Sequence, residues 1–166
     1  MMTTYVGFYG LFGSPKTLNL SEGMATFAEM LRFNNIGKNL KNGVYPHNSL
    51  KTVLEVTQKT ISKNTEIVVF GHSLGAISAF KYAREMSRKG YKIKCVLLFD
   101  YVTSVSLWWD KRTAYQVAAP VYHFRSSDLR AIKLPGSLEY NYSKLNHLQI
   151  DSNKDVLQTA LKIALK

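Results

Sequence analysis

The chain has 166 residues, of which 46% are hydrophobic and 20% are charged, a composition typical of a folded domain with a substantial core. No apolar run is long enough to cross a bilayer, and the N-terminal residues lack the basic and then apolar pattern of a secretory signal. The single cysteine, Cys95, excludes an internal disulfide and is expected to fill the core. We therefore expect a cytoplasmic protein with one domain that spans residues 1–166.

The charge is strongly positive, with 22 Lys and Arg residues against 11 Asp and Glu residues and a formal net charge of +11. A charge of this size favours attraction to anionic membrane surfaces, acidic substrates or nucleic acid. Nucleic-acid modules normally concentrate basic residues on one element, whereas here they are spread along the chain without a dense tract. The charge therefore identifies neither a partner nor an oligomeric state, and a basic surface without a special role is the simpler interpretation.

Strand and helix patterns alternate in the first half of the chain. Tyr5 to Tyr9 is predicted as a strand that runs into a glycine-rich loop at residues 10–15. Apolar residues at helical spacing predict one helix from Leu20 and a second from Leu50 to Ile61. Between these helices we expect a loop with a short edge strand near Val44.

The second half continues this alternation. Residues 66–70 are predicted as a strand buried on both faces, followed at once by a helix to about Lys89 that Gly90 ends. Two further strands and an amphipathic terminal helix are predicted at residues 92–99, 121–124 and 156–164. The segment 126–147 is expected to be mostly polar loop. Strands separated by helices predict an α/β fold, a three-layer, doubly wound and mostly parallel sheet in a single domain.

Gly71-His72-Ser73-Leu74-Gly75 lies between a predicted strand and a predicted helix. Gly-x-Ser-x-Gly at such a junction is the pattern of a nucleophile elbow, a tight turn that exposes one serine hydroxyl above the sheet. Side chains in place of the two glycines would collide with the neighbouring strand and helix. The five-residue motif is weakly specific by itself, but its position between these elements predicts that Ser73 is a catalytic nucleophile.

A serine nucleophile needs a base and an acid, which follow it in the order serine, acid, histidine in loops at the carboxyl ends of strands. His147, before the terminal helix, is the expected base. Asp128 is the preferred acid because it follows the strand nearest to the loop with His147. Asp100 also follows a strand and is the alternative acid.

Proton chemistry explains these residue types. A serine hydroxyl is a poor nucleophile at neutral pH, so His147 must accept its proton during attack on a carbonyl and later return it to the leaving group. Asp128 would fix the imidazole tautomer and stabilise the imidazolium. The negative charge on the tetrahedral intermediate needs backbone N–H donors, which we expect from Leu74 and from Leu11 in the loop after the first strand.

A few other residues are candidates for the site. Four side chains are candidates for lining a substrate pocket: Phe12, His72, Trp108 and Trp109. His72 is also expected to support the turn, and the two tryptophans suit a membrane-facing rim or core packing equally well. His123 lies inside a predicted strand and is expected to be packed or hydrogen-bonded rather than catalytic.

With these motifs identified, the chain resembles the α/β-hydrolase superfamily, and most closely its small lidless bacterial lipases and esterases. The resemblance covers essentially the whole chain and is carried by Tyr9-Gly10-Leu11-Phe12-Gly13, the elbow, Arg125-Ser126-Ser127-Asp128 and Asn146-His147. Tyr9 replaces the usual histidine of the oxyanion motif, and Asn146 replaces a glycine that often precedes the catalytic histidine. The resemblance implies that a small-molecule or lipid carboxylic ester is hydrolysed through an acyl-enzyme, without a metal or an organic cofactor.

Two other functions stay open from the sequence. The same residues suit a thioesterase or an acyltransferase, which differ from an esterase in leaving group and acceptor and share its motifs. A non-catalytic binding protein can also use this scaffold, because a fold does not determine a function. Candidates for acid and histidine in the expected loops argue against the binding protein, which has no need of them.

Overall fold

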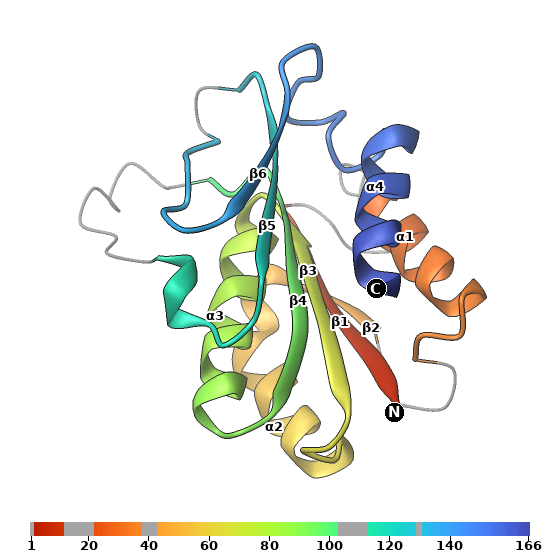
Figure 1. Ribbon diagram of the computed structural model, residues 1–166, viewed down its shortest axis with the longest axis vertical. Helices are drawn as coiled ribbons and strands as arrows, with labels where there is room; N and C mark the ends of the chain where they lie inside the picture. The colour runs from red at the N-terminus through yellow and green to blue at the C-terminus, as the bar shows by residue number, and fades with distance from the viewer. Residues whose placement is uncertain (1, 12–21, 38–42, 103–112, 129–130) are drawn as a thin grey trace.

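The computed structural model describes residues 2–11, 22–37, 43–102, 113–128 and 131–166. Among these residues, six strands form one sheet in which every neighbouring pair is parallel. The strands are β1 (Thr3–Tyr9), β2 (Gly43–Pro46), β3 (Glu66–His72), β4 (Lys92–Phe99), β5 (Val121–Ser126) and β6 (Leu138–Tyr142). They lie in the sheet in the order β2-β1-β3-β4-β5-β6 (Figure 1).

Helices cover both faces of this sheet. One face is covered by α1 (Glu22–Phe33) and α4 (Lys154–Leu165), the other by α2 (Leu50–Thr60) and α3 (Leu74–Arg88) (Figure 1). Two short 3-10 helices, η1 (His47–Ser49) and η3 (Ala114–Gln116), precede α2 and β5. The arrangement confirms the predicted fold class, a three-layer α/β structure with a parallel sheet.

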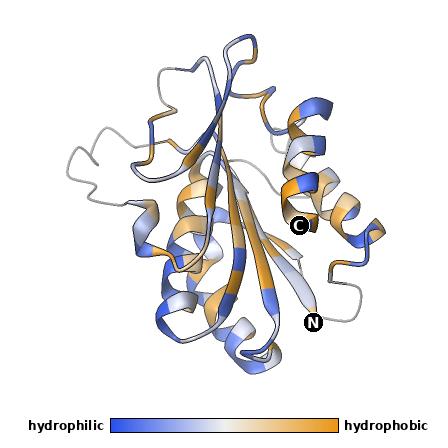
Figure 2. Cartoon of the chain, in the orientation of Figure 1, coloured by the Kyte–Doolittle hydropathy of each residue, from blue (hydrophilic) through white to orange (hydrophobic). Residues whose placement is uncertain are grey.

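Each face of the sheet has its own apolar core. On β3, Ile67 and Val69 pack toward α2 and α3, whereas Val68 and Phe70 pack toward α1 and α4, because successive side chains of a strand point to opposite faces. All four are fully buried, which explains the continuous apolar run in the sequence. The central strands are accordingly hydrophobic along most of their length (Figure 2). Cys95 is buried in the α1/α4 core, as expected.

The predicted loop 126–147 contains a strand that the sequence analysis missed. Residues 138–142 form β6, which pairs in parallel with β5. Along it, Leu138, Tyr140 and Tyr142 alternate with polar residues, a period typical of strands. The Tyr140 ring stacks on Phe124 of β5 with centroids 5.2 Å apart. The prediction of loop is therefore wrong for this segment.

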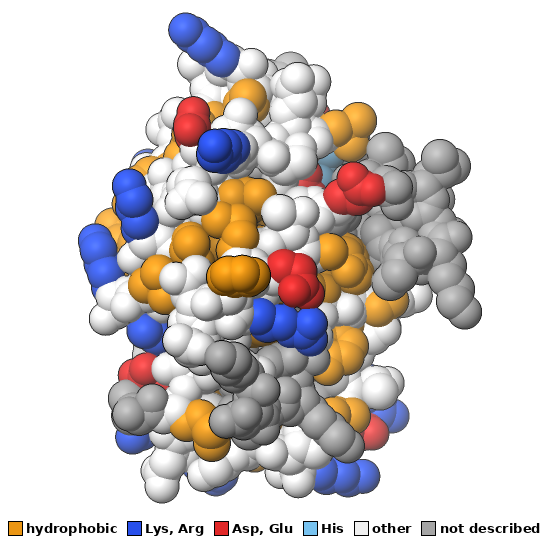
Figure 3. Space-filling model, turned by 90° about the vertical axis from the view of Figure 1, so that its right-hand side faces the viewer, with side chains coloured by type: hydrophobic (Ala, Val, Ile, Leu, Met, Phe, Trp, Pro, Cys, Tyr) orange, Lys and Arg blue, Asp and Glu red, His pale blue; other side chains and the backbone are white. Residues whose placement is uncertain are grey.

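None of the helices that the structure describes is long and apolar enough to span a membrane. On the face that carries α1 and α4, Lys and Arg side chains are scattered among neutral and apolar ones (Figure 3). The positive charge is therefore spread over this face, as it is along the sequence.

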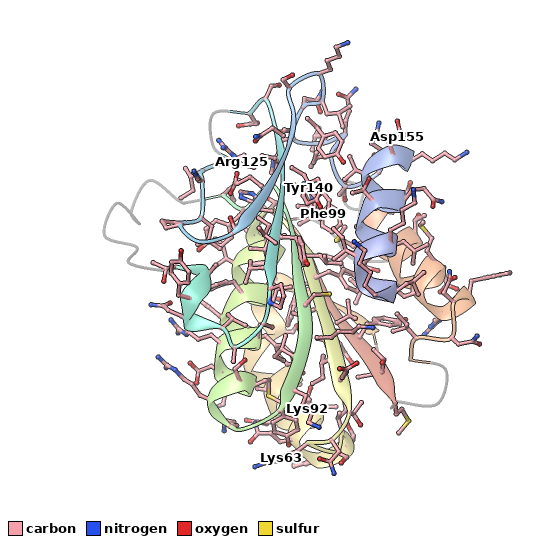
Figure 4. All side chains as sticks on the ribbon, in the orientation of Figure 1. Lys63, Lys92, Phe99, Arg125, Tyr140 and Asp155 are labelled. Carbon is pink, nitrogen blue, oxygen red and sulfur yellow. The ribbon has the colours of Figure 1, made fainter. Side chains whose placement is uncertain are left out.

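Parallel strands bring their carboxyl ends to one edge of the sheet. Phe99, Arg125 and Tyr140 lie toward this edge, and Lys63 and Lys92 lie at the opposite one (Figure 4). The loops that follow β1, β3, β4 and β5 therefore begin near one another, and they contain the predicted site residues.

Candidate active site

Ser73 lies in a sharp turn between β3 and α3. Its backbone φ of 58° is in the left-handed region, which residues other than glycine rarely adopt. The Ser73 N–H donates to the carbonyl of Phe99 on β4 at 2.9 Å, so the neighbouring strand holds the turn. The structure thus has the abrupt strand-to-helix turn that the motif predicts.

The glycines on either side of Ser73 permit contacts that a side chain would prevent. A Cβ atom at Gly75 would overlap the carbonyl oxygens of Phe8 and Tyr9 at the end of β1. A Cβ atom at Gly71 would overlap the carbonyl of Gly75 itself. Gly75 therefore lets the first turn of α3 pack directly against β1, and Gly71 lets the same turn pack against the end of β3.

Ser73, His147 and Asp100 form a continuous hydrogen-bonded chain. The Ser73 Oγ lies 2.9 Å from His147 Nε2, and His147 Nδ1 lies 3.0 Å from Asp100 Oδ2. Because an ionised carboxylate can only accept, Nδ1 carries the ring proton and Nε2 accepts from the serine hydroxyl. Asp100 is fully buried, Ser73 is 9% exposed and the His147 side chain is 11% exposed. The imidazole is therefore oriented to take a proton from Ser73.

Asp100 follows β4 directly and is held by β5. Its φ is 46°, and its N–H donates to the carbonyl of Phe124 at 2.8 Å. The carboxylate accepts hydrogen bonds from both the N–H and the hydroxyl of Ser126. Together with the His147 ring, these donors fix the orientation of the carboxylate.

The structure places Asp100, not Asp128, beside the imidazole. Asp128 lies past the end of β5, where its N–H donates to the Ser126 hydroxyl at 3.1 Å. That hydroxyl in turn donates to Asp100. The preference for Asp128 assumed that the strand nearest to the His147 loop supplies the acid, but β4, the neighbour of β3, does so. The acid that contacts His147 is thus the alternative, Asp100.

The turn that carries His147 is stabilised by the residue before it. The Asn146 side-chain oxygen accepts from the N–H groups of Leu148 and Gln149 at 3.0 and 3.1 Å. The Gln149 side chain accepts from the Asn146 N–H at 3.0 Å. Asn146 therefore supplies contacts that a glycine at this position cannot make.

The two predicted oxyanion donors belong to segments that meet beside Ser73. The N–H of Leu74 is in the first turn of α3, where N–H groups lack an acceptor within the helix. Leu11 lies just past β1, whose end packs against the same turn at Gly75. Their role as donors stays a prediction.

Of the four side chains that were predicted to line a substrate pocket, the structure describes that of His72. Phe12, Trp108 and Trp109 lie outside the described residues. His72 is 2% exposed, and its ring centroid lies 4.7 Å from that of His147. Its Nε2 lies 2.9 Å from the His147 carbonyl oxygen. His72 thus supports the His147 turn from behind rather than lining an open surface.

Asp151 is a buried carboxyl group near the site that sequence reasoning missed. Its Oδ2 lies 3.5 Å from His72 Nδ1. Burial raises the pKa of Asp151 to about 7, and the charges of Asp100 and Glu22 act in the same direction. Burial, followed by the charge of His147, lowers the pKa of His72 to about 4. No local motif signals this pair, because its members are distant in the sequence.

His123 is hydrogen-bonded through both ring nitrogens. The N–H of Tyr101 donates to His123 Nε2 at 3.0 Å, so Nδ1 carries the proton and donates to Glu139 at 3.2 Å. Glu139 also accepts from Ser137 at 2.7 Å and from Arg125 at 3.4 Å. Because Tyr101 follows Asp100, His123 fixes the main chain directly beyond the acid.

The chemistry available here is that of an activated serine. A hydroxyl that donates to an imidazole, itself oriented by a carboxylate, is suited to attack on a carbonyl. Within the described ranges, no group of three or more His, Cys, Asp or Glu side chains is arranged to hold a metal ion.

Comparison with known proteins identifies the family of the chain. The model of the Thioesterase domain matches residues 19–133, which is more than half of the chain. The search of curated proteins finds no match. Among solved structures, RedJ, a thioesterase from the prodiginine pathway of Streptomyces coelicolor, is similar with a TM-score of 0.61 and 14% identity, over 97% of this chain and 85% of that one.

Two other solved structures are similar over most of their length. YbtT, a type II thioesterase from the yersiniabactin pathway, has a TM-score of 0.58 and 9% identity, over 97% of this chain and 92% of its own. A cutinase-like protein from Cryptococcus sp. has a TM-score of 0.57 and 12% identity, over 99% and 93%. At these identities the structures show the shared α/β-hydrolase fold, while the family model shows the family. The chain belongs to the thioesterase domain family and is a hydrolase of the α/β-hydrolase type.

Proposed function

We propose that this protein is a serine thioesterase, which hydrolyses an acyl thioester through an acyl-enzyme on Ser73. The observation that carries the proposal is the hydrogen-bonded chain from Ser73 through His147 to Asp100. Membership of the thioesterase domain family supports a thioester as the substrate. The motifs alone favoured a carboxylic ester as the substrate over a thioester, and family membership supports the thioester instead.

In the first half of the reaction, Ser73 Oγ attacks the thioester carbonyl carbon while its proton passes to His147 Nε2. The tetrahedral oxyanion is stabilised by the main-chain N–H groups of Leu74 and Leu11. Asp100, which accepts from His147 Nδ1–H, stabilises the imidazolium. The C–S bond then breaks, and the leaving sulfur takes the proton from His147 to become a free thiol.

In the second half, water hydrolyses the acyl-enzyme. His147, neutral again, takes a proton from the water as its oxygen attacks the acyl carbon. Collapse of the second tetrahedral intermediate breaks the bond to Ser73 Oγ, which regains its proton from His147. The products are a carboxylic acid and a free thiol.

The surroundings of Ser73 suit an apolar acyl group. Leu11, two residues past the end of β1, and Leu148, the residue after His147, are 48% and 55% exposed. Exposed large apolar side chains in the loops that carry the site residues would provide contact area for an acyl chain. The thiol that carries this chain is a small molecule or belongs to an acyl-carrier protein.

The test compares matched substrates and variants. Acyl-coenzyme A thioesters of increasing chain length and p-nitrophenyl esters of the same acids are assayed with the wild type, Ser73→Ala and Ser62→Ala. Ser62 is an exposed serine near Lys63, at the opposite edge of the sheet, and serves as the control. We expect a higher kcat/KM for thioesters, and a loss of at least about a thousandfold in Ser73→Ala only.

A fluorophosphonate probe gives an independent readout. It is expected to label the wild type and Ser62→Ala but not Ser73→Ala. Equal hydrolysis and equal labelling of the wild type and Ser73→Ala would refute the proposed nucleophile. A higher kcat/KM for the oxygen esters would instead identify an esterase that uses the same residues.

A further inference from the structure

Two consecutive serines lie where β5 ends, between the segments that carry the acid and the base. Ser126 is the last residue of β5, and Ser127 follows it. In the sheet, β5 lies between β4, which Asp100 follows, and β6, which precedes the His147 turn (Figure 1). The Ser126–Ser127 pair is therefore placed to contact both segments.

Ser126 holds the carboxylate of Asp100 through two donors. Its N–H donates to Asp100 Oδ1 at 2.6 Å, and its hydroxyl donates to Oδ2, the oxygen that also accepts from His147 Nδ1. The direction of the hydroxyl follows from its partners, because the N–H of Asp128 donates to its oxygen at 3.1 Å and an ionised carboxylate can only accept. Both oxygens of the buried carboxylate are thus held by one residue of β5.

Ser127 holds the segment before His147 in the same way. Its N–H and its hydroxyl both donate to the main-chain carbonyl of Leu145, each at 2.9 Å. A carbonyl oxygen has two lone pairs, so it can accept both bonds. Leu145 lies two residues before His147, and its own N–H donates at 3.0 Å to the carbonyl of Tyr142, the last residue of β6. The loop that carries the imidazole is thus tied to the end of β5.

The two attachments act on one distance. The hydrogen bond from His147 Nδ1 to Asp100 Oδ2, at 3.0 Å, joins the segment after β4 to the segment after β6. Ser126 and Ser127 are covalently linked neighbours, so the covalent geometry of the chain fixes the separation between the donors to the acid and the donors to the His147 loop. A change at either serine lets this separation vary, and a second change therefore adds little to the first.

We propose that Ser126 and Ser127 are positioning residues, which together hold Asp100 and the loop of His147 at the separation that their hydrogen bond requires. The inference rests on the proposed function, in which His147 is the general base. The serines act only through Asp100 and Leu145, so they make and break no covalent bond. Their loss lets the imidazole turn away from the geometry in which it takes the proton of the nucleophile.

The experiment measures kcat and KM for the hydrolysis of an acyl-coenzyme A thioester by Ser126→Ala, Ser127→Ala and the variant with both changes. Each single change removes a hydroxyl donor and keeps the N–H, so we expect kcat to fall about tenfold and KM to stay within about twofold of the wild type. The double variant is expected to lose no more than about twentyfold, since both changes free the same distance. Unchanged kcat in the single variants would overturn the inference, and so would a loss of about a hundredfold in the double variant, which would show that the serines act separately.

Conservative variants and a matched control separate positioning from stability. Ser126→Thr and Ser127→Thr keep the hydroxyl and should recover most of the lost kcat. Thr57→Val removes a different buried hydroxyl, on α2, which donates to the Val53 carbonyl at 2.8 Å and accepts from Tyr82 at 2.9 Å. This control should lower the midpoint of urea unfolding and leave kcat unchanged. Equal losses of kcat in the alanine and threonine variants, or the same loss in Thr57→Val, would indicate general damage to the fold and contradict the positioning role.

A readout without substrate separates this inference from the proposed function. The proton on His147 Nδ1, which is donated to Asp100, should give a sharp downfield proton NMR resonance in the wild type, assigned by its absence from His147→Ala. We expect exchange with water to broaden this resonance in Ser126→Ala and Ser127→Ala but not in the threonine variants. An equally sharp resonance in the alanine variants would overturn the positioning role even with Ser73 essential for turnover. Full activity of Ser73→Ala would overturn the proposed function, which the NMR measurement does not test.

Discussion

Two buried histidines lie on opposite faces of the sheet, and each has a carboxyl group beside it. His72, on the α1/α4 face, lies 3.5 Å from Asp151, and His123, on the α2/α3 face, lies 3.2 Å from Glu139. Each histidine holds one part of the site. His72 holds the carbonyl of His147, and His123 holds the N–H of Tyr101, next to Asp100.

The two carboxyl groups nevertheless have opposite properties. Burial would raise the pKa of Glu139, but hydrogen bonds from His123 and Ser137, with the charges of His123 and Arg125, lower it instead. Asp151 is also buried, and burial with the charges of Asp100 and Glu22 raises its pKa to about 7, although a hydrogen bond from its own backbone N–H lowers it. The difference teaches that side-chain hydrogen bonds and nearby positive charge can outweigh burial, as they do at Glu139, whereas burial prevails at Asp151. Folding therefore lowers the pKa of Glu139, whereas it raises that of Asp151 into the neutral range.

Both pairs act on the contact between Asp100 and His147, so the largest effect is expected from breaking that contact. Asp100→Asn should lower kcat by about 10⁴-fold, because the amide favours the wrong imidazole tautomer. Asp128→Asn, the matched change one strand away, should stay within about threefold of the wild type. Thioester hydrolysis by both variants checks this, and the reverse order would restore Asp128 as the acid.

Replacing the carboxyl group of each pair in turn by an amide tests whether folding shifts the two pKa values in opposite directions. In the folded protein the pKa of Asp151 is raised, so the wild type loses stability as the pH rises from about 4 to about 7. Asp151→Asn lacks this loss. Between about pH 4 and 7, its free energy of unfolding relative to that of the wild type should therefore rise by up to about 4 kcal/mol. Glu139→Gln should behave oppositely and lose about 1–3 kcal/mol above pH 4.5, where Glu139 is ionised in both states.

Urea unfolding at pH 4, 5.5, 7 and 8 measures both differences. Because folding lowers the pKa of Glu139, the ionised carboxylate stabilises the folded protein above pH 4.5. This stabilisation disappears as the pH falls through the lowered pKa. Equal pH dependence of the two variants would show that the pairs do not differ in charge state.

The smallest expected effect comes from His72. His72→Phe keeps an aromatic ring behind His147 but removes the donor to its carbonyl, and kcat should fall about tenfold. His72→Gln keeps an N–H at the distance of Nε2 and should recover most of that loss. His47→Gln, in η1 before α2, is the control and should leave kcat unchanged. Equal rates for His72→Phe and His72→Gln would contradict a role for the hydrogen bond.

The parts of the site that local patterns encode could be predicted from the sequence. Four apolar residues before Gly71 and helical spacing after Gly75 define the turn around Ser73, and the physical reason for both glycines lies within a few residues of them. Strand β6, which was missed, carried the same kind of signal in its alternating Leu138, Tyr140 and Tyr142. There the polar character of the surrounding segment obscured the alternation.

The parts that depend on how distant segments meet could not be predicted in this way. Asp100 and Asp128 both follow strands, and only the order β3-β4-β5 in the sheet, with Ser126 between the two carboxyl groups, decides which one contacts His147. The approach of Asp151 to His72 depends on the close contact of Gly23 with the Asp151 main chain. Neither relation leaves a pattern within a single stretch of sequence.

The main-chain bonds of Ser73 to Phe99 and of Asp100 to Phe124 continue the hydrogen-bonding of the sheet past the ends of β3 and β4. The spacing of nucleophile and acid is therefore inherited from the spacing of adjacent strands, and no loop has to encode it. Over evolutionary time, insertions into the loops at this edge can alter substrate choice without disturbing that spacing. Of the three residues in the hydrogen-bonded chain, His147 is the one whose position depends on its loop, so insertions into the segment after β6 are expected to disturb that chain most directly.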